Sequence, residues 1–355
     1  MSRLRRVLHP LYRKLECAVH PLRYLFLEIT QRCNLRCRHC GSDCGRDTRL
    51  DELSTDEWLA FFGYLAVRCD RRKLALVLTG GEPLCHPEWD RILRGLREHG
   101  LAWGMVSNGF GLDRENMARA VEAGLISLTV SLDGMRKSHD QLRGRKGSFE
   151  RAVKALELAV AARVRFLDVV TCVHPGNLDE LDSVMGLLER IGLSRWRLFS
   201  IFPKGRAREN EDLLMGAEGF KRMLGFIEEA REQKAARGFH VDFSCEGYLP
   251  DRWERAVRDE PYFCRAGISI GSVLCDGAIS ACPNISRSLV QGNIRTDDFL
   301  TVWEERFQPF RDRSWLRKGP CADCAHFAAC QGNSLHLYDE QLGHTVLCTY
   351  KLLCD

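Results

Sequence analysis

Residues 30–40 read Thr-Gln-Arg-Cys-Asn-Leu-Arg-Cys-Arg-His-Cys, and the interpretation of the chain starts from them. Cys33, Cys37 and Cys40 have the spacing C-x3-C-x2-C and follow an apolar run at residues 24–29. A short loop that gathers three thiolates can bind three irons of a [4Fe-4S] cluster, which leaves the fourth iron open to a ligand from outside the protein. Two alternatives fit the same residues. One is a zinc site completed by an outside ligand; the other includes Cys44 and is a closed, ferredoxin-like cluster that only carries electrons.

The spacing of this loop resembles the cysteine motif of the radical SAM superfamily. The resemblance implies that Cys33, Cys37 and Cys40 are catalytic, because the open iron binds the amino and carboxylate groups of S-adenosylmethionine (SAM). The reduced cluster then passes one electron to the sulfonium, and the 5′-deoxyadenosyl radical removes a hydrogen atom from the substrate. One residue departs from the family, which usually has a large aromatic residue before the third cysteine, where this chain has His39.

Apolar runs rich in β-branched residues alternate with amphipathic helical stretches along most of the chain. The predicted strands are 24–30, 74–79, 102–107, 125–132, 166–173 and 196–202, and the predicted helices are 55–68, 87–99, 114–123, 148–162, 178–191 and 217–236. Strict alternation indicates a parallel sheet, and six units rather than eight indicate a partial (β/α)6 TIM-like barrel. We expect an α/β fold with a basic segment at 1–23, the barrel at 24–238 and a smaller cysteine-rich iron–sulfur domain at 239–355.

Glycine-rich and polar residues follow the predicted strands, at the edge of a parallel sheet where ligands bind. The second strand is followed by Gly80, Gly81, Glu82 and Pro83, the third by Asn108, and the fourth by Ser131 and Asp133, with Arg143 further on. In the radical SAM family, a Gly-Gly-Glu-Pro motif contacts the methionine amino group of SAM. The resemblance also implies that Ser131, Asp133 and Arg143 surround the ribose and carboxylate of SAM.

The C-terminal part holds a second group of cysteines, Cys321-x2-Cys324-x5-Cys330 followed by Cys348. Four thiolates with this spacing suit either a [4Fe-4S] cluster or a structural zinc ion. The region resembles the SPASM domain of radical SAM peptide-modifying enzymes, in which these four cysteines hold one auxiliary cluster.

A first auxiliary cluster is also implied by the SPASM resemblance, with Cys264 and Cys282 among its ligands. The family expects a further cysteine where this chain has Ser334, and Cys275 is a candidate replacement. We therefore expect one or two auxiliary iron–sulfur clusters.

Composition narrows the remaining possibilities. The chain has 355 residues, 45% of them hydrophobic, and 17 cysteines. Because no export signal or membrane-length apolar run is evident, metal binding in the cytoplasm explains the cysteines better than disulfides do. The net charge of +4 does not support a nucleic-acid surface. Residues 1–24 carry six basic side chains against Glu16 alone, which suits peripheral contact with an anionic membrane or an acidic partner, or a solvated helix packed on the barrel.

The sequence therefore predicts a radical SAM enzyme that abstracts hydrogen from a peptide or protein substrate, as in side-chain oxidation or crosslinking. It would need an external one-electron reductant such as flavodoxin or ferredoxin. One alternative is a radical SAM enzyme acting on a small-molecule or lipid-linked substrate. Others are an iron–sulfur electron carrier without SAM chemistry, and a zinc scaffold. Glu28 and Asp168 lie in predicted barrel strands and could face inward, but neither is singled out as a general base.

Overall fold

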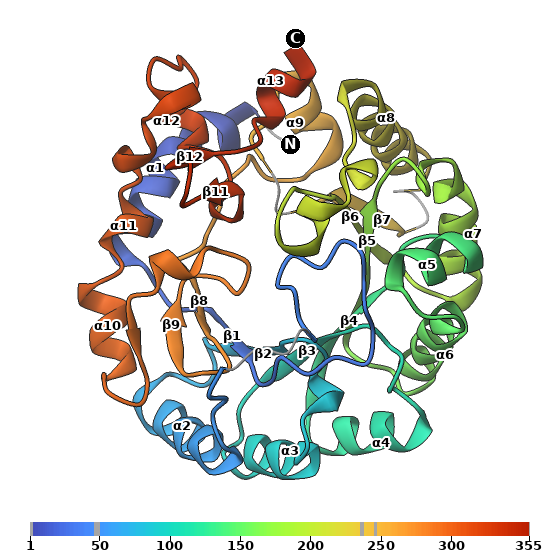
Figure 1. The fold of residues 1–355 in the computed structure, drawn as a ribbon, viewed down its shortest axis with the longest axis vertical. Coiled ribbons are helices and arrows are strands. Elements are labelled where there is room, and N and C mark those ends of the chain that lie inside the picture. Colours follow the sequence, from blue (N-terminus) through green and yellow to red (C-terminus); the bar gives the residue numbers. More distant parts are fainter. Residues whose placement is uncertain (1–2, 46–49, 235–237, 245–246, 355) are drawn as a thin grey trace.

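A computed structural model describes residues 3–45, 50–234, 238–244 and 247–354, with side chains from residue 8 onward. Its centre is a curved sheet whose first six strands are parallel and adjacent in chain order (Figure 1). These strands are β1 (Tyr24–Glu28), β2 (Ala75–Thr79), β3 (Trp103–Ser107), β4 (Leu125–Ser131), β5 (Phe166–Val173) and β6 (Arg195–Ser200). All six match the predicted strands to within a few residues, so the partial barrel is confirmed.

Helices connect successive strands and cover the outside of the sheet (Figure 1). They are α2 (Thr55–Arg68), α3 (Trp89–Glu98), α4 (Arg114–Glu122), α5 (Arg136–Arg143), α6 (Ser148–Ala161), α7 (Leu181–Ile191) and α8 (Ala217–Lys234). The start of α2 shows why the sequence places it well, since Ser54 and Glu57 form a reciprocal capping box. The helix α5 was not predicted. Residues 235–236, the end of the last predicted helix, lie outside the described residues.

Alternate residues of the strands face the helices and form the core. In β1, Leu25 and Leu27 are fully buried, as is Ile29 just beyond the strand. Large aromatic side chains are also fully buried, including Trp58 of α2, Trp103 of β3 and Trp196 of β6. Burial of this many apolar side chains supplies the main driving force for the fold.

The C-terminal part of the chain is built onto both edges of the barrel sheet. Strand β7 (His240–Phe243) pairs parallel with β6, and β8 (Ile270–Val273) pairs parallel with β1. Strands β9 (Ala278–Ser280) and β10 (Gly292–Asn293) continue the sheet as an antiparallel hairpin. One continuous sheet therefore crosses the predicted boundary at residue 239, and the domain limits remain a prediction.

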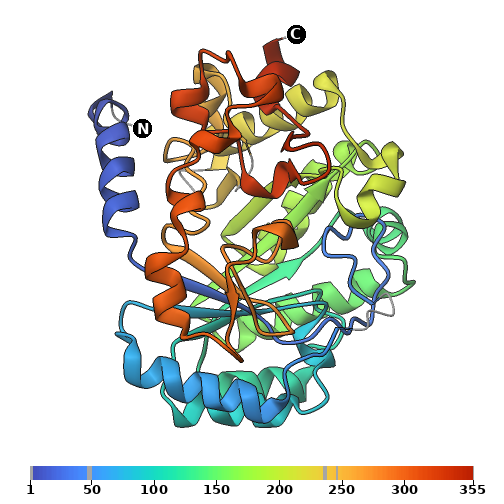
Figure 2. The same cartoon turned by 60° about the vertical axis from the view of Figure 1, so that its left-hand side comes forward.

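Short elements dominate after Cys264. The C-terminal elements not yet named are α9 (Asp251–Val257), α10 (Phe299–Glu305), α11 (Gln308–Arg311), α12 (Phe327–Cys330), α13 (Thr349–Cys354), and the paired strands β11 (Tyr338–Asp339) and β12 (His344–Thr345). At the other end of the chain, α1 (Arg3–Val19) lies along the outside of this C-terminal part (Figure 2).

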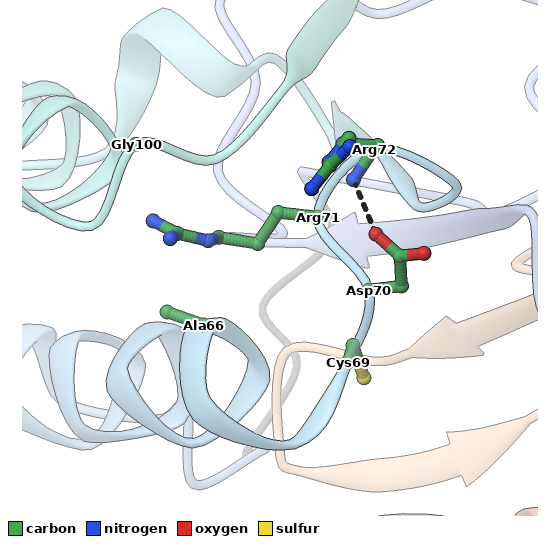
Figure 3. Close-up of a pocket in the computed structure, with 6 residues that line it drawn as sticks. All are labelled: Ala66, Cys69, Asp70, Arg71, Arg72 and Gly100. Carbon is green, nitrogen blue, oxygen red and sulfur yellow. Dashed lines mark hydrogen bonds between the residues drawn. The ribbon is translucent and has the colours of Figure 1, made fainter.

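A hollow of about 450 Å³ lies at the amino ends of β2 and β3, and Figure 3 shows the residues that line it. It is bordered by the turn between α2 and β2, including Asp70 and Arg71, and by Gly100 just before β3. These positions precede strands, whereas ligand sites of parallel sheets lie at the carboxyl ends. Within the described residues, no helix combines the length and apolar character needed to cross a bilayer.

Candidate active site

The cysteine loop follows β1 and crosses the carboxyl ends of the barrel strands (Figure 1). The glycine loop after β2 packs directly against it: the Gly81 amide donates to the Thr30 carbonyl at 2.9 Å, and the Glu82 amide to the Arg32 carbonyl at 3.0 Å. Gly80 has φ +141°, and a Cβ there would overlap the Thr30 carbonyl oxygen. Only glycine permits this close approach, so the two predicted motifs depend on each other for their shape.

The glutamate of the glycine loop is buried and fixed. Glu82 accepts hydrogen bonds from the Ser107 hydroxyl at 2.8 Å and the Asn108 amide at 2.7 Å. Burial raises the pKa of Glu82 to about 7, against the lowering effect of these hydrogen bonds. The side-chain amide of Asn108 donates to Asn34 at 2.8 Å, which ties the end of β3 to the cysteine loop.

Asp133 and Arg143 form a buried ion pair at the edge of the same site. The Arg143 Nε donates to the Asp133 carboxylate at 2.5 Å, and its Nη1 lies 3.6 Å from the Cys37 sulfur. Burial acts to raise the pKa of Asp133, but Arg143, His39, His139 and the hydrogen bond from the Cys172 amide together lower it to about 2. The Cys172 amide donates to the other carboxylate oxygen at 2.8 Å. Ser131, the last residue of β4, is also buried.

Neutral imidazoles surround this ion pair. Burial lowers the pKa of His39 to about 3 and that of His139 to about 4. His39 Nε2 lies 4.0 Å from the Asp133 carboxylate, and His139 Nδ1 accepts from the Asp133 amide at 3.0 Å. At the position before the third cysteine, where the family usually has a large aromatic residue, this chain therefore has the flat, uncharged ring of His39 beside Asp133.

The loop cysteines are mostly buried, and their protonation differs. Burial raises the pKa of Cys33 to about 12 and also raises that of Cys37. A hydrogen bond from Cys44 lowers the pKa of Cys40 to about 6. Cys44 is buried, and its hydrogen bond to Cys40 places it next to the three-cysteine set as a hydrogen-bond donor.

Ligand spacing tests whether these cysteines fit a single metal ion. Four sulfurs bound to zinc at about 2.3 Å must lie within roughly 3.8 Å of one another. In the described part of the chain, one group of three His, Cys, Asp or Glu residues has all its ligand atoms within 4.8 Å, and it comprises His39, Asp133 and Cys172. Neither predicted cysteine set is that compact among the described residues, so neither is preformed for a single zinc ion.

A residue that the sequence did not single out holds the cysteine loop from the far side. Arg206 Nε donates to the Cys37 carbonyl at 2.7 Å, and its Nη1 to the Cys44 carbonyl at 2.8 Å. The preceding Gly205 has φ +54°, and a Cβ there would overlap the Cys40 carbonyl oxygen. Arg206 lies in the segment Pro-Lys-Gly-Arg-Ala after β6, and nothing in the sequence assigns this segment a partner.

The two inward carboxylates differ in their surroundings. Asp168 is bonded to the Thr129 hydroxyl at 2.6 Å and to the Arg197 guanidinium, so it serves as a structural acceptor. Glu28, the last residue of β1, is 4% exposed and accepts from Gln31 at 2.8 Å. Burial raises the pKa of Glu28 to about 7, which suits proton exchange near neutral pH.

A single cavity of about 260 Å³ is lined by Cys354 and by the four C-terminal cysteines that were predicted as cluster ligands. These four are Cys321, Cys324, Cys330 and Cys348. The Asn333 amide lies 3.1 Å from the Cys330 sulfur, and the Lys351 amide 3.5 Å from the Cys348 sulfur. Amide hydrogen bonds of this kind stabilise cluster thiolates, so the donor set fits an iron–sulfur cluster.

The residues predicted for a first auxiliary cluster are only partly gathered. Cys264 and Cys282 are charge neighbours. Burial raises the pKa of Cys282 to about 11. Burial also acts to raise the pKa of Cys264, but the charge of Arg313 and hydrogen bonds from the Leu335 and Ala266 amides together lower it. Ser334 is buried, with its hydroxyl 3.0 Å from that of Tyr262.

Cys275 is fully buried. Its charged neighbours are Glu28, the last residue of β1, together with Asp276 and Glu52. His336, two residues after Ser334, is buried, and its Nε2 has no hydrogen-bond partner among the described residues.

Comparison with known proteins decides the family. Residues 27–188 match the radical SAM superfamily, and residues 264–325 match SPASM, an iron–sulfur cluster-binding domain. The mycofactocin maturase MftC of Mycolicibacterium smegmatis is 30% identical over 87% of this chain and 76% of its own length. This chain is a radical SAM enzyme with a SPASM domain. The expected family, fold class and enzyme activity are thereby confirmed.

Relatives of this radical SAM enzyme include proteins named as heme synthases as well as maturases. The AdoMet-dependent heme synthase of Methanosarcina barkeri is 28% identical over 89% of this chain and 92% of its own length. Among solved structures, anSMEcpe with bound AdoMet superposes with a TM-score of 0.71, at 15% identity and with 94% of each chain covered. At that identity the structural likeness shows the fold alone.

Membership fixes the cofactor classes. Radical SAM domains bind a [4Fe-4S] cluster together with SAM, and SPASM domains bind further iron–sulfur clusters. The electron carrier without SAM chemistry and the zinc scaffold are therefore set aside.

Proposed function

We propose that Cys33, Cys37 and Cys40 hold the catalytic cluster, and that Gly80–Pro83, Asn108, Ser131, Asp133 and Arg143 position SAM beside it. One observation carries this proposal: the ends of β2 and β3 and the helix α5 meet the cysteine loop through polar contacts, and Asp133 after β4 is bonded to Arg143 of α5. The bound cluster and SAM supply a 5′-deoxyadenosyl radical. Residues of the chain contribute by orienting SAM and by excluding water from it.

Each positioning residue has a defined task in this proposal. Glu82, ionised, accepts a hydrogen bond from the SAM amino group. Asp133 accepts from ribose hydroxyls, and Arg143 offers a planar fork to a carboxylate. Arg143 also holds Asp133 ionised, so one guanidinium serves both the ribose and the carboxylate ends of the ligand.

The auxiliary sites would exchange electrons with the substrate radical. We propose Cys321, Cys324, Cys330 and Cys348 as ligands of one cluster, and Cys264 and Cys282 as ligands of another, with Cys275 the predicted addition. The position of Cys275 beside Glu28 argues for a different role, and His336 offers a buried nitrogen near the site. In this proposal, the barrel at 24–238 and the auxiliary domain at 239–355 are the two functional domains. A reductant such as flavodoxin or ferredoxin in the cytoplasm would supply the electrons.

The substrate we propose is a peptide or protein side chain, oxidised or crosslinked after loss of hydrogen. The maturase MftC and the PqqA peptide cyclase of Rhizobium meliloti, which is 26% identical over 93% of this chain, support this substrate class. A second candidate is a small molecule of the tetrapyrrole class. It is favoured by heme synthase relatives, whose own lengths are covered to 90–92%.

Anaerobic purification, reduction and addition of SAM test the reaction itself. Release of 5′-deoxyadenosine supports it, and iron without 5′-deoxyadenosine contradicts it. An iron content near eight atoms per chain would indicate one auxiliary cluster, and near twelve would indicate two, if each has four irons.

Substrate class is tested by adding either a pool of synthetic peptides or Fe-coproporphyrin III. A peptide that loses two hydrogens supports the first candidate. Consumption of the porphyrin, together with faster 5′-deoxyadenosine release, supports the second.

A further inference from the structure

The outer face of α1 is apolar and uncovered. Nine large apolar side chains are exposed among the described residues, and four of them lie on this one helix. They are Leu8, Leu11, Leu15 and Val19, with exposed fractions of 48%, 67%, 61% and 59%. Their spacing of three, four and four residues puts them on one stripe of an α-helix. Figure 2 shows α1 at the edge of the molecule with no other element beyond it.

The opposite face of α1 is firmly attached. The Arg265 guanidinium donates to the Tyr12 hydroxyl at 2.8 Å, and Arg13 donates to the Ala329 carbonyl. Glu16 is buried and accepts two hydrogen bonds from Arg23 at 2.8 Å. With its polar inner face fixed to the C-terminal part, the helix cannot turn to bury the apolar stripe.

Charge indicates what could cover this stripe. The helix sequence carries Arg3, Arg5, Arg6, Arg13 and Lys14, and its one acidic residue is Glu16. Glu16 is already neutralised by Arg23, and Lys14 is exposed beside the stripe. A basic helix with one apolar face matches the interface of an anionic bilayer, where apolar side chains enter the headgroup region and cations contact lipid phosphates.

We propose that α1 docks this enzyme onto an anionic lipid surface through Leu8, Leu11, Leu15 and Val19. This goes beyond the proposed radical chemistry and does not depend on it. The helix lies flat on the bilayer, because its inner face stays bonded to Arg265 and Arg23.

Vesicle co-sedimentation of the full chain tests the proposal, with phosphatidylcholine vesicles that do or do not contain about 30% phosphatidylglycerol. We expect sedimentation with the anionic vesicles and at least tenfold weaker binding to the neutral ones. Raising the salt from about 0.1 M to about 0.5 M should weaken binding to the anionic vesicles, because screening shortens the reach of the basic residues.

Substitutions distinguish binding through the apolar stripe of α1 from nonspecific adsorption of the protein to vesicles. Leu11→Glu together with Leu15→Glu should reduce anionic vesicle binding at least tenfold. The matched control Val67→Glu, at a side chain that is 84% exposed on α2, should leave binding unchanged. Both changes are at exposed positions, and equal melting temperatures and iron contents would establish that the variants are folded.

Three results would overturn the proposal. The first is wild-type protein that sediments with neither kind of vesicle, and the second is a double variant that sediments like wild type. The third is a wild-type dimer in light scattering that the double variant converts to a monomer, while neither form binds vesicles, because the stripe would then join two copies of this chain.

Discussion

The two cysteine sites of this chain are assembled in different ways. The loop cysteines Cys33, Cys37 and Cys40 are surrounded by side chains from several barrel strands and from α5, many of them polar and fixed. The C-terminal cysteines close around a small cavity with aromatic neighbours such as Tyr248 and Phe327. Their amide donors come from the same short turns that carry the cysteines.

This difference separates a site built to admit a ligand from one built to hold a cluster. Carboxylates and guanidinium groups cost free energy to bury. They are therefore found in protein interiors mainly at sites where they bind a polar ligand. The C-terminal cavity needs only thiols and amides, because its expected content is complete with four cysteines. The predictions below test that contrast, from the largest expected effect to the smallest.

Removing one loop cysteine should eliminate the reaction. Cys37→Ala leaves two ligands on the barrel cluster, and we expect 5′-deoxyadenosine release to fall to the detection limit with loss of about four irons per chain. The matched control is Cys44→Ala, which should keep both cluster and cleavage. If Cys44→Ala lost the cluster as well, the barrel site would be of the closed type.

Removing one C-terminal cysteine should separate cleavage from turnover. Cys324→Ala is expected to lose about four irons yet retain some 5′-deoxyadenosine release, while substrate conversion stops. Cys354, an exposed thiol that lines the same cavity but is not among the predicted ligands, offers a control: Cys354→Ala should leave iron and turnover unchanged. Full turnover by Cys324→Ala would disprove an electron-transfer role for this site.

Breaking the buried ion pair should destabilise the barrel rim. Arg143→Met leaves Asp133 charged and unpaired, which should lower the free energy of unfolding by about 3–5 kcal/mol and weaken SAM binding. On the same helix, Arg136 is 71% exposed, and Arg136→Met should change stability by no more than about 0.5 kcal/mol. Equal losses in chemical denaturation would mean that the pair has no special importance.

SAM affinity should depend on pH through Glu82. With a pKa of about 7, this carboxylate is mostly ionised at pH 8 and mostly protonated at pH 6, so SAM should bind about tenfold more weakly at pH 6. The dependence should vanish in Glu82→Gln. It should persist in Glu28→Gln, whose carboxyl has a similar pKa but lies elsewhere. Equilibrium binding over this pH range gives the answer, and a flat wild-type profile would contradict the role of Glu82.

The barrel could be predicted closely because its determinants are local. The α2 prediction matched both ends of the helix, since Ser54 and Glu57 cap it and its apolar residues repeat with a helical period. By contrast, α5 was missed because its eight residues are mostly charged or polar and show little apolar periodicity. Its one terminating signal is Gly144, in the left-handed conformation.

Site residues were predictable where a motif spans a few positions, and not where the partner is distant in sequence. The Gly80–Pro83 motif was evident, but its contact with Thr30 and Arg32 follows from strand order. Arg206 lies about 170 residues from Cys37, and only the fold brings them together. The pairing of β8 with β1 could likewise not be predicted, because the sequence of a four-residue strand does not specify which strand it pairs with.

The pairing of β1 with β8 has a consequence for folding of the chain during its synthesis on the ribosome. Strand β1 leaves the exit tunnel early, but its second neighbour β8 follows only some 245 residues later. At about 5–20 residues per second, this takes roughly 12–50 seconds, during which one edge of β1 is open. The cysteine loop at the end of β1 is therefore translated long before its strand is flanked on both sides. Iron delivered too early would meet thiols on an unfinished sheet, which favours loading of the cluster after release of the complete chain.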